Sequence, residues 1–171
     1  MKTTILKFFT LSAAIFAFST ISFGQNDASD AASVGAVIVT PISISKVTDL
    51  HFGNLAATNA PYKVKLDFVG DRTVTGTTKN VMPTITGSVS VASFTASGLA
   101  GAAYAITLPS DDAVTLSGIG APMTLEAFNH NANLILTSGE ETFNVVATLN
   151  VNAGQAAGTY NGSFNVIVNY N

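Results

Sequence analysis

Apolar and polar side chains alternate along a stretch close to the C-terminus of the chain. From Thr142 to Val151 every second residue is apolar, and four of the five residues between them are polar. The apolar row consists of Phe143, Val145, Ala147, Leu149 and Val151. A period of two places all members of a row on the same face of an extended chain. The pattern therefore predicts a β-strand with one buried face.

A second alternating stretch runs from Thr159 to Tyr170, with Ile167 as the one apolar residue in its polar row. Its apolar row consists of Tyr160, Phe164, Val166, Val168 and Tyr170. A helix would bring Phe164 and Val168 together and turn Val166 to the opposite side, so a strand is favoured. Because Asn150–Gly158 is small, polar and rich in glycine, it is predicted to be the loop of a long hairpin joining the two strands.

Weaker alternation predicts further strands at Val37–Val47, Tyr62–Phe68, Ile85–Val91, Ala102–Leu108, Ala113–Leu116 and Pro122–Phe128. The phase slips by one residue before Phe94, which indicates a β-bulge or a strand that changes sheets. No stretch after residue 24 keeps an apolar stripe at helical spacing between a cap and a stop. Seven to nine short strands separated by turns predict an all-β, antiparallel sandwich, and a closed barrel is the alternative.

The first 24 residues have the pattern of a secretory signal peptide. Lys2 and Lys7 precede an apolar run that several hydroxyl side chains interrupt, and Ser22 and Gly24 suit cleavage before Gln25. The run is shorter than the roughly 20 residues that cross a bilayer, so it favours a cleaved signal over a membrane anchor. We therefore expect an exported protein with no membrane span after cleavage, located in the periplasm, on the outer surface or outside the cell. Its parts are a signal peptide (1–24), a flexible leader (25–35) and one sandwich domain (36–171).

Composition narrows the classes of function. The 171-residue chain has no cysteine, which excludes a disulfide scaffold, a zinc–cysteine site and a thiol nucleophile. Its formal net charge of -3 argues against a nucleic-acid binder, which needs a basic stripe. After the signal peptide, all basic residues lie between Lys46 and Lys79. One interpretation is ordinary solvation, with Lys63 and Lys65 protecting an edge strand, and the other is a dipolar molecule that stacks head to tail.

Few residues suit catalysis. On a strand, Asp49 and His51 would share a face, and a carboxylate there can orient an imidazole. His130 lies in the polar stretch Asn129–Asn133, which is typical of a turn. The Gly-x-Ser-x-Gly motif of many serine hydrolases does not occur in the sequence. We therefore predict a non-enzymatic protein without catalytic residues.

Two acidic pairs, Asp111–Asp112 and Glu140–Glu141, are candidates for binding a cation. Calcium takes six to eight oxygen ligands, and the spacing of an EF-hand loop does not occur. Asp111 and Asp112 are better explained as turn residues, so no metal and no cofactor is predicted. A glycan is the alternative ligand, and Tyr62, Tyr104 and the Asn129–Asn133 loop are the residues that suit it.

Four segments together resemble the DUF4402 family of bacterial exported proteins. They are Ala36–Ile44 with Asp49–Leu55, Gly101–Pro109, Met123–Phe128 and Gly158–Tyr170. The family has no known function, but its closing Gly-x-Tyr-x-Gly strand looks like the last strands of pilin and spore-coat-U-type domains. The resemblance thus implies an immunoglobulin-like sandwich with a structural or adhesive role at the cell surface. The segment Thr58–Asn80 is longer than the family pattern, which suggests an extra hairpin.

The closing motif also has a physical interpretation. Gly158 and Gly162 flank Tyr160 and permit a tight entry to the strand or a bulge. The Tyr160 ring is predicted to be buried, with its hydroxyl bonded to the backbone, as in the corner tyrosines of sandwiches.

These observations favour a structural or adhesive envelope protein, such as a fimbrial-type subunit. Its partners would be itself or other surface proteins, bound by strand addition, in which a peptide extends an open sheet. The segment Val34–Ile44 is the candidate donor strand, with Ile38, Ile42 and Ile44 as its anchors. A surface glycan-binding module is the alternative function.

Overall fold

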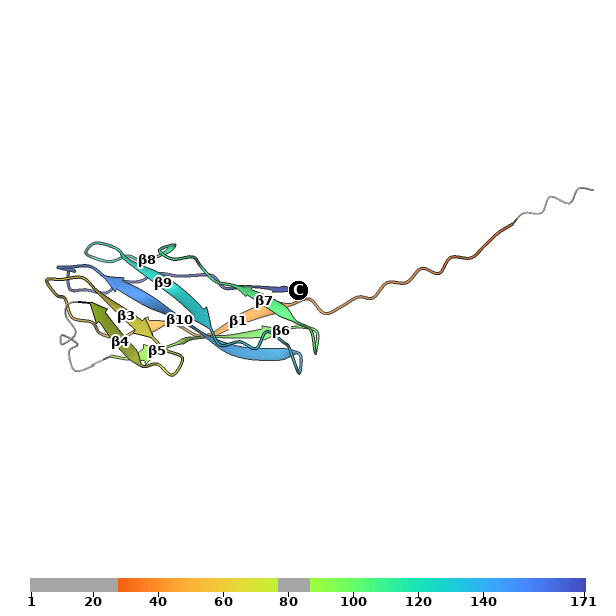
Figure 1. Cartoon of the computed structure of the whole chain (residues 1–171), viewed down its shortest axis with the longest axis horizontal. Helices are drawn as coiled ribbons and strands as arrows, with labels where there is room; N and C mark the ends of the chain where they lie inside the picture. The colour runs from red at the N-terminus through yellow and green to blue at the C-terminus, as the bar shows by residue number, and fades with distance from the viewer. Residues whose placement is uncertain (1–27, 77–86) are drawn as a thin grey trace, which may run out of the picture. The chain divides into compact units, whose positions relative to one another are not determined.

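The computed structural model describes residues 28–76 and 87–171 and contains no helix in these ranges (Figure 1). No described segment is therefore a helix able to cross a membrane. The predicted signal peptide, residues 1–24, lies outside the described residues and stays a prediction. The chain divides into two compact units, residues 1–37 and 38–171. Within the first unit, residues 28–37 are exposed and have no regular structure.

Eleven strands form in the described part of the second unit, and every pair of them is antiparallel. They are β1 (Ser43–Thr48), β2 (His51–Phe52), β3 (Tyr62–Leu66), β4 (Arg72–Gly76), β5 (Val89–Ser90), β6 (Ala92–Ser97), β7 (Tyr104–Thr107), β8 (Val114–Leu116), β9 (Met123–His130), β10 (Glu140–Val151) and β11 (Ile167–Tyr170). The predicted all-β, antiparallel, sandwich-like fold is confirmed. The strands outnumber the seven to nine expected, partly because several are only two to four residues long.

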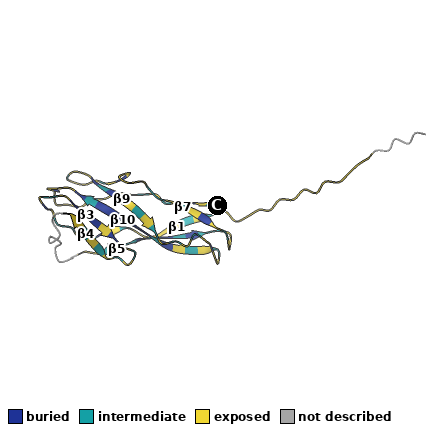
Figure 2. Cartoon of the chain, viewed as in Figure 1, coloured by how far each residue is buried: buried dark blue, intermediate teal, exposed yellow. Residues whose placement is uncertain are grey.

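Strand β10 organises the main seven-stranded sheet (Figure 1). Along one edge it pairs first with β6, through residues 140–145, and then with β3, through residues 148–151. Along its other edge it pairs with β9. Strands β1, β4 and β8 lie outside β6, β3 and β9 respectively. Every predicted apolar position of β10 is buried (Figure 2). Val146 and Thr148, on the opposite face of the strand, are buried as well.

The phase slip before Phe94 is a change of sheet. Strand β5 pairs with the short strand β2, whereas β6 begins after Val91 and joins β1 and β10 in the main sheet. A chain that moves from one sheet to another must turn its side chains to a different core, which shifts the alternation by one residue. The slip was therefore interpreted correctly, although residues 85–86 of the predicted strand lie outside the described ranges.

The predicted hairpin between the last two strands is wrong. Strand β11 pairs with β7 instead of β10, and the only strand-like pairing of residues 159–166 is a single bridge between Asn161 and Ser117. The loop after Val151 thus carries the chain to the opposite layer. Alternation shows which face of a strand is buried, but it does not identify the neighbouring strand. The buried row is nevertheless as predicted, since Val168 is buried and Ile167 is exposed.

A second correction concerns the lysines of β3. This strand lies inside the sheet, between β10 and β4, so Lys63 and Lys65 do not protect an edge. The hairpin predicted within Thr58–Asn80 is present as β3 and β4. Its turn is closed by Asp67, whose carboxylate accepts hydrogen bonds from the amides of Val69 and Asp71 at 3.0 and 2.8 Å.

Two clusters of buried side chains form the core. One lies between β6 and the first half of β10 on one side and β7 and β11 on the other, and the rings of Phe94 and Phe143 stack in it with centroids 6.0 Å apart. The other, here called the open core, is contributed by β2, β3, β8, β9 and the second half of β10. It includes Leu66, Leu125 and Leu149. Two segments, residues 48–57 and 155–164, form the layer that covers the open core, and a gap remains between them.

Candidate functional site: a groove over the open core

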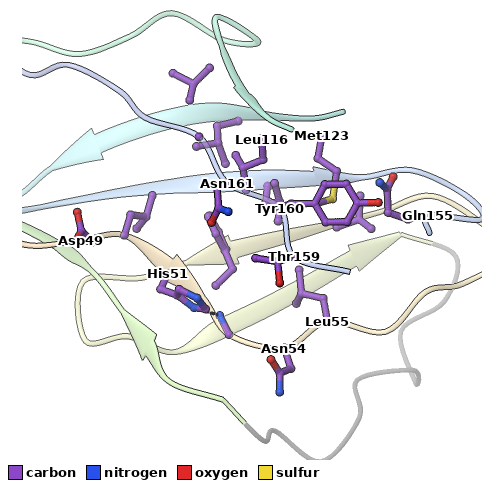
Figure 3. A pocket seen from close by; sticks show the side chains of 18 of the residues that line it. Asp49, His51, Asn54, Leu55, Leu116, Met123, Gln155, Thr159, Tyr160 and Asn161 are labelled. Atoms are coloured by element: carbon purple, nitrogen blue, oxygen red, sulfur yellow. Dashed lines mark hydrogen bonds between the residues drawn. The ribbon is translucent and has the colours of Figure 1, made fainter. Parts of the chain in front are cut away.

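A groove of about 810 Å³ separates two segments that cover the open core (Figure 3). One wall is residues 48–57, which include β2, and the other wall is residues 155–164. Figure 3 shows side chains from both walls, among them His51 and Leu55 from the first and Thr159 and Tyr160 from the second. We refer to this cavity as the groove.

Within the described ranges, the flanks of the two walls are joined by two hydrogen bonds. The amide of Gly154 donates to the carbonyl of Thr58 at 2.7 Å, next to the start of one wall and the end of the other. Farther from the groove, on the other side of β1, the Tyr170 hydroxyl donates to the carbonyl of Thr40 at 2.8 Å. Between these points, no backbone hydrogen bond connects the walls within the described ranges. The covering layer is therefore split along its length.

The wall formed by residues 155–164 has little backbone pairing of its own. The backbone hydrogen bonds between residues 157–165 and the rest of the described chain are the two that join Asn161 and Ser117, at 2.8 and 3.0 Å. Side-chain amides support the start of the wall, since Gln155 donates to the carbonyl of Ala121 at 2.6 Å. Most amides and carbonyls on the groove side thus have no protein partner among the described residues. Such groups are available to a further strand.

Glycines fix this wall against β8 and the loop that follows it. A Cβ at Gly162 would lie 2.5 Å from the carbonyl oxygen of Thr115, and one at Gly118 would lie 2.5 Å from that of Thr159. The Tyr160 ring packs on Gly118, and its hydroxyl donates to the carbonyl of Ala156 at 2.9 Å. The predicted backbone partner of Tyr160 is thus confirmed, although the ring is half-buried. These close approaches hold the wall next to β8 and away from residues 48–57.

The floor of the groove consists of side chains of the open core. They are Phe52, Tyr62, Val114, Leu116, Met123, Leu125, Leu149 and Val151. Protein interiors are normally packed without voids much larger than a water molecule. A cavity of this volume that reaches the core is of the size that binds small molecules or side chains. Its floor is uncharged, so it suits an apolar occupant.

Asp49 and His51 line the groove but do not form the predicted pair. The Asp49 carboxylate accepts from Lys46 Nζ at 2.6 Å, and both side chains of this ion pair are exposed. His51 Nδ1 accepts from the amide of Gly53 at 2.9 Å, in a tight local turn. Each group is thus occupied by a neighbour in the sequence. No hydrogen bond joins the two side chains to each other among those of the described residues.

Arg72, at the start of β4, supports the first wall. Its Nη1 donates to the carbonyls of Phe52 and Asn54, at 2.6 and 3.0 Å. Its Nε and Nη2 are buried without a hydrogen-bond partner among the described residues. The guanidinium fastens residues 52–54 to the edge of the main sheet, and the sequence offered no sign of this role.

The other candidate residues have structural roles elsewhere. Asp111 accepts from the amide of Ala127 at 2.7 Å, where β9 bulges with a positive φ of 51°. Asp112 accepts from the Thr124 hydroxyl at 2.5 Å. His130 ends β9 and accepts from the amide of Ala132 at 3.2 Å. Within residues 28–76 and 87–171, no three acidic or histidine side chains gather in a group able to hold a metal.

The tyrosines considered for glycan binding are buried. Tyr62 donates to the carbonyl of Ala56 at 2.6 Å, and its pKa is raised by burial and lowered, less strongly, by Arg72. Tyr104 is completely buried and donates to Glu141 Oε2 at 2.8 Å. Burial raises the pKa of Tyr104 strongly, and the hydrogen bond to Glu141 raises it further. Neither ring can stack on a sugar from solvent, so the glycan alternative loses its aromatic residues.

A comparison with protein families shows which family this chain belongs to. A family described as a domain of unknown function, DUF4402, matches residues 42–170. The chain belongs to the DUF4402 family. No curated protein and no solved structure matches it. Both walls of the groove lie inside the DUF4402 match, whereas residues 28–41 precede it.

The groove itself was not predicted from the sequence. Its walls come from segments about 100 residues apart, and nothing in an alternating pattern marks the absence of a strand between them. The nearest signal was the small, glycine-rich character of residues 152–162, which sequence reasoning assigned to a hairpin loop and a strand entry.

Proposed function

We propose that this DUF4402 protein is an exported, non-enzymatic structural protein of the bacterial cell envelope, and that it assembles by accepting a β-strand into the groove. The observation that carries the proposal is the groove itself. A covering layer is split over an uncharged core, and its walls are not paired with each other in the described chain.

Strand addition fits both properties of the groove. An added strand forms main-chain hydrogen bonds with an open edge and places every second side chain in pockets beneath it. Residues 157–164 of the second wall supply an open edge, and the uncharged floor supplies the pockets. A small soluble substrate would instead need convergent polar or titratable groups. The candidate groups at this site, Asp49 and His51, are bonded to Lys46 and Gly53.

Export and a surface role rest on the N-terminal pattern and on the family resemblance. Lys2 and Lys7 before an apolar run, with small residues before Gln25, support removal of residues 1–24 during secretion. A protein without cysteine keeps no thiol exposed to the oxidising conditions outside the cytoplasm.

Electrophoresis in mild SDS tests assembly. The proposal predicts a ladder of multimers from envelope fractions that collapses to the single-chain band on boiling, because boiling unfolds the sandwich and releases the added strand. A sharp monomer in unboiled samples and in concentrated solution would refute assembly through the groove. Cell fractionation of the same culture tests export, and recovery of the full-length chain from the cytoplasm alone would refute it.

A further inference from the structure

We infer that the occupant of the groove is the segment Val34–Val39 of a second copy of this chain. The inference rests on the proposed function, because it names the strand that the groove accepts. It also assigns a role to residues 28–41, which precede the family match and take no part in the strands.

The donor segment, Val34–Val39, carries large apolar side chains that are unusually exposed. Val34, Val37 and Ile38 are 97, 89 and 98% exposed, the three highest values among the exposed large hydrophobic residues. Isolated surface hydrophobics are ordinary, but several within one short segment indicate an interaction site. The segment has no regular structure, so its amides and carbonyls are free to pair.

The sequence of the donor segment suits strand addition. Val34, Ala36 and Ile38 form one row of an extended chain, and they are the side chains that enter the groove. Residues 31–45 carry no charge, which matches the uncharged floor. Six residues in extended form span about 20 Å, and each ten-residue wall spans at most about 33 Å. The donor is therefore short enough to lie between the two walls.

The donor is shorter than the Val34–Ile44 strand considered from the sequence. Ile42 and Ile44 pack on the core beneath β6, and β1 begins at Ser43 and pairs with β6. They belong to their own domain and cannot enter another one. Of the three predicted anchors only Ile38 remains, and Val34 joins it.

The chain's own N-terminal segment is poorly placed to fill its own groove. Strand β1 lies between Ile42 and residues 49–57, and its six residues span about 17 Å between the first and last Cα. A segment that turned back before Ile42 would therefore use residues 34–39 to run alongside β1, and it would reach only the end of the groove that Lys46 and Thr48 line. A second copy can place all six residues between the walls, which produces a head-to-tail chain of subunits.

Disulfide trapping tests the inference, because the chain has no cysteine of its own. Full-length chains carrying Ile38→Cys are mixed with chains carrying Thr159→Cys, whose exposed side chain lines the groove. The mixed disulfide dimer is expected to form at least about 10-fold more than from Val69→Cys with Thr159→Cys. Val69 is 83% exposed and lies in the turn between β3 and β4, so it is the matched control. Equal yields from both mixtures would overturn the inference.

Two further variants separate this inference from the proposed function. Ile38→Lys is expected to weaken assembly on the order of 100-fold, since an anchor is lost and a charge enters the groove. Val69→Lys is expected to leave assembly unchanged. Thr159→Trp, which fills the groove from an exposed position, should also abolish assembly.

The results for the three variants, taken together, distinguish failure of this inference from failure of the proposed function. Loss of assembly in Ile38→Lys and in Thr159→Trp, but not in Val69→Lys, supports both the donor and the groove. If Thr159→Trp abolishes assembly and Ile38→Lys does not, another strand fills the groove; the inference is then overturned and the proposed function stands. If the unaltered chain stays monomeric at every concentration, both are overturned.

Discussion

The two glycines of the Gly-x-Tyr-x-Gly motif are expected to differ sharply when each is replaced by alanine. A Cβ at Gly162 would meet the carbonyl oxygen of Thr115 at 2.5 Å and its carbonyl carbon at 3.2 Å. These are backbone atoms of β8 itself, at a residue that pairs with Thr124 of β9, so they cannot move aside cheaply. A Cβ at Gly158 would meet only the side chain of Ile119, with Cγ2 at 2.6 Å and Cβ at 3.7 Å. Ile119 is 78% exposed and can rotate away.

The magnitude follows from these contacts. Overpacking a site that cannot relax costs about 1–3 kcal/mol, and displacing the wall also weakens two backbone hydrogen bonds between Asn161 and Ser117, worth roughly 1 kcal/mol each. Gly162→Ala should therefore lower the free energy of unfolding by about 2–4 kcal/mol. Gly158→Ala should change it by less than about 1 kcal/mol in either direction.

Urea denaturation of the two variants and the unaltered chain measures this difference. Neither glycine has a positive φ, so loss of backbone freedom is similar in the two variants and cancels in the comparison. Equal destabilisation by the two substitutions, or a larger effect at Gly158, would show that Gly162 does not pack against the backbone of β8. The position of the groove wall would then be wrong.

Two further predictions concern polar pairs away from the groove. The pKa of Glu126 is lowered, mainly by its hydrogen bond from Lys63, so this pair stabilises the fold above about pH 4.5 and its contribution is lost as the pH falls through the lowered pKa. The free energy of unfolding, measured from pH 6 to pH 3, should accordingly fall less steeply in Lys63→Met than in the unaltered chain. Lys65→Met, on the same strand, is the control and should keep the original slope. Identical slopes in all three proteins would contradict the pairing. Replacing Tyr104 by phenylalanine removes the hydroxyl that donates to Glu141 at 2.8 Å and should cost about 1–2 kcal/mol in urea denaturation, and an unchanged midpoint would show that the buried hydroxyl does not hold this bond.

Much of the fold was predictable because burial of one face imposes a period of two. The inward row of β10 was correct at every position, and so was the slip before Phe94 where the chain changes sheets. Alternation carries this information locally, without reference to any other part of the chain.

Partner strands and the incomplete layer were not predictable in this way. The C-terminal strand was predicted to pair with β10, but it pairs with β7. The residues before it, 158–162, pack instead against β8 and the loop after β8, where Gly162 and Gly118 permit close backbone contact. Lys63 and Lys65 resembled the charges of an edge strand, yet the addition of β4 places β3 inside the sheet. Both errors have the same physical origin, since pairing depends on contacts between distant segments.

The candidate site shows the same division. Asp49 and His51 were found from their spacing and do line the groove, but local bonds to Lys46 and Gly53 occupy them. Arg72, which fastens the first wall, had no signal in the sequence because its acceptors are backbone carbonyls. Ile38 was named from the sequence as an anchor together with Ile42 and Ile44, and only the structure separates the three: Ile38 is exposed, whereas Ile42 and Ile44 pack on the core.

Hydrogen–deuterium exchange of the purified chain, measured by mass spectrometry over a range of protein concentrations, tests the central claim most directly. The account predicts that the amides of residues 34–39 and 157–164 become protected together as the concentration rises, because both sets pair in the same added strand. Exchange of residues 34–39 at the rate of an unstructured peptide at every concentration would contradict it.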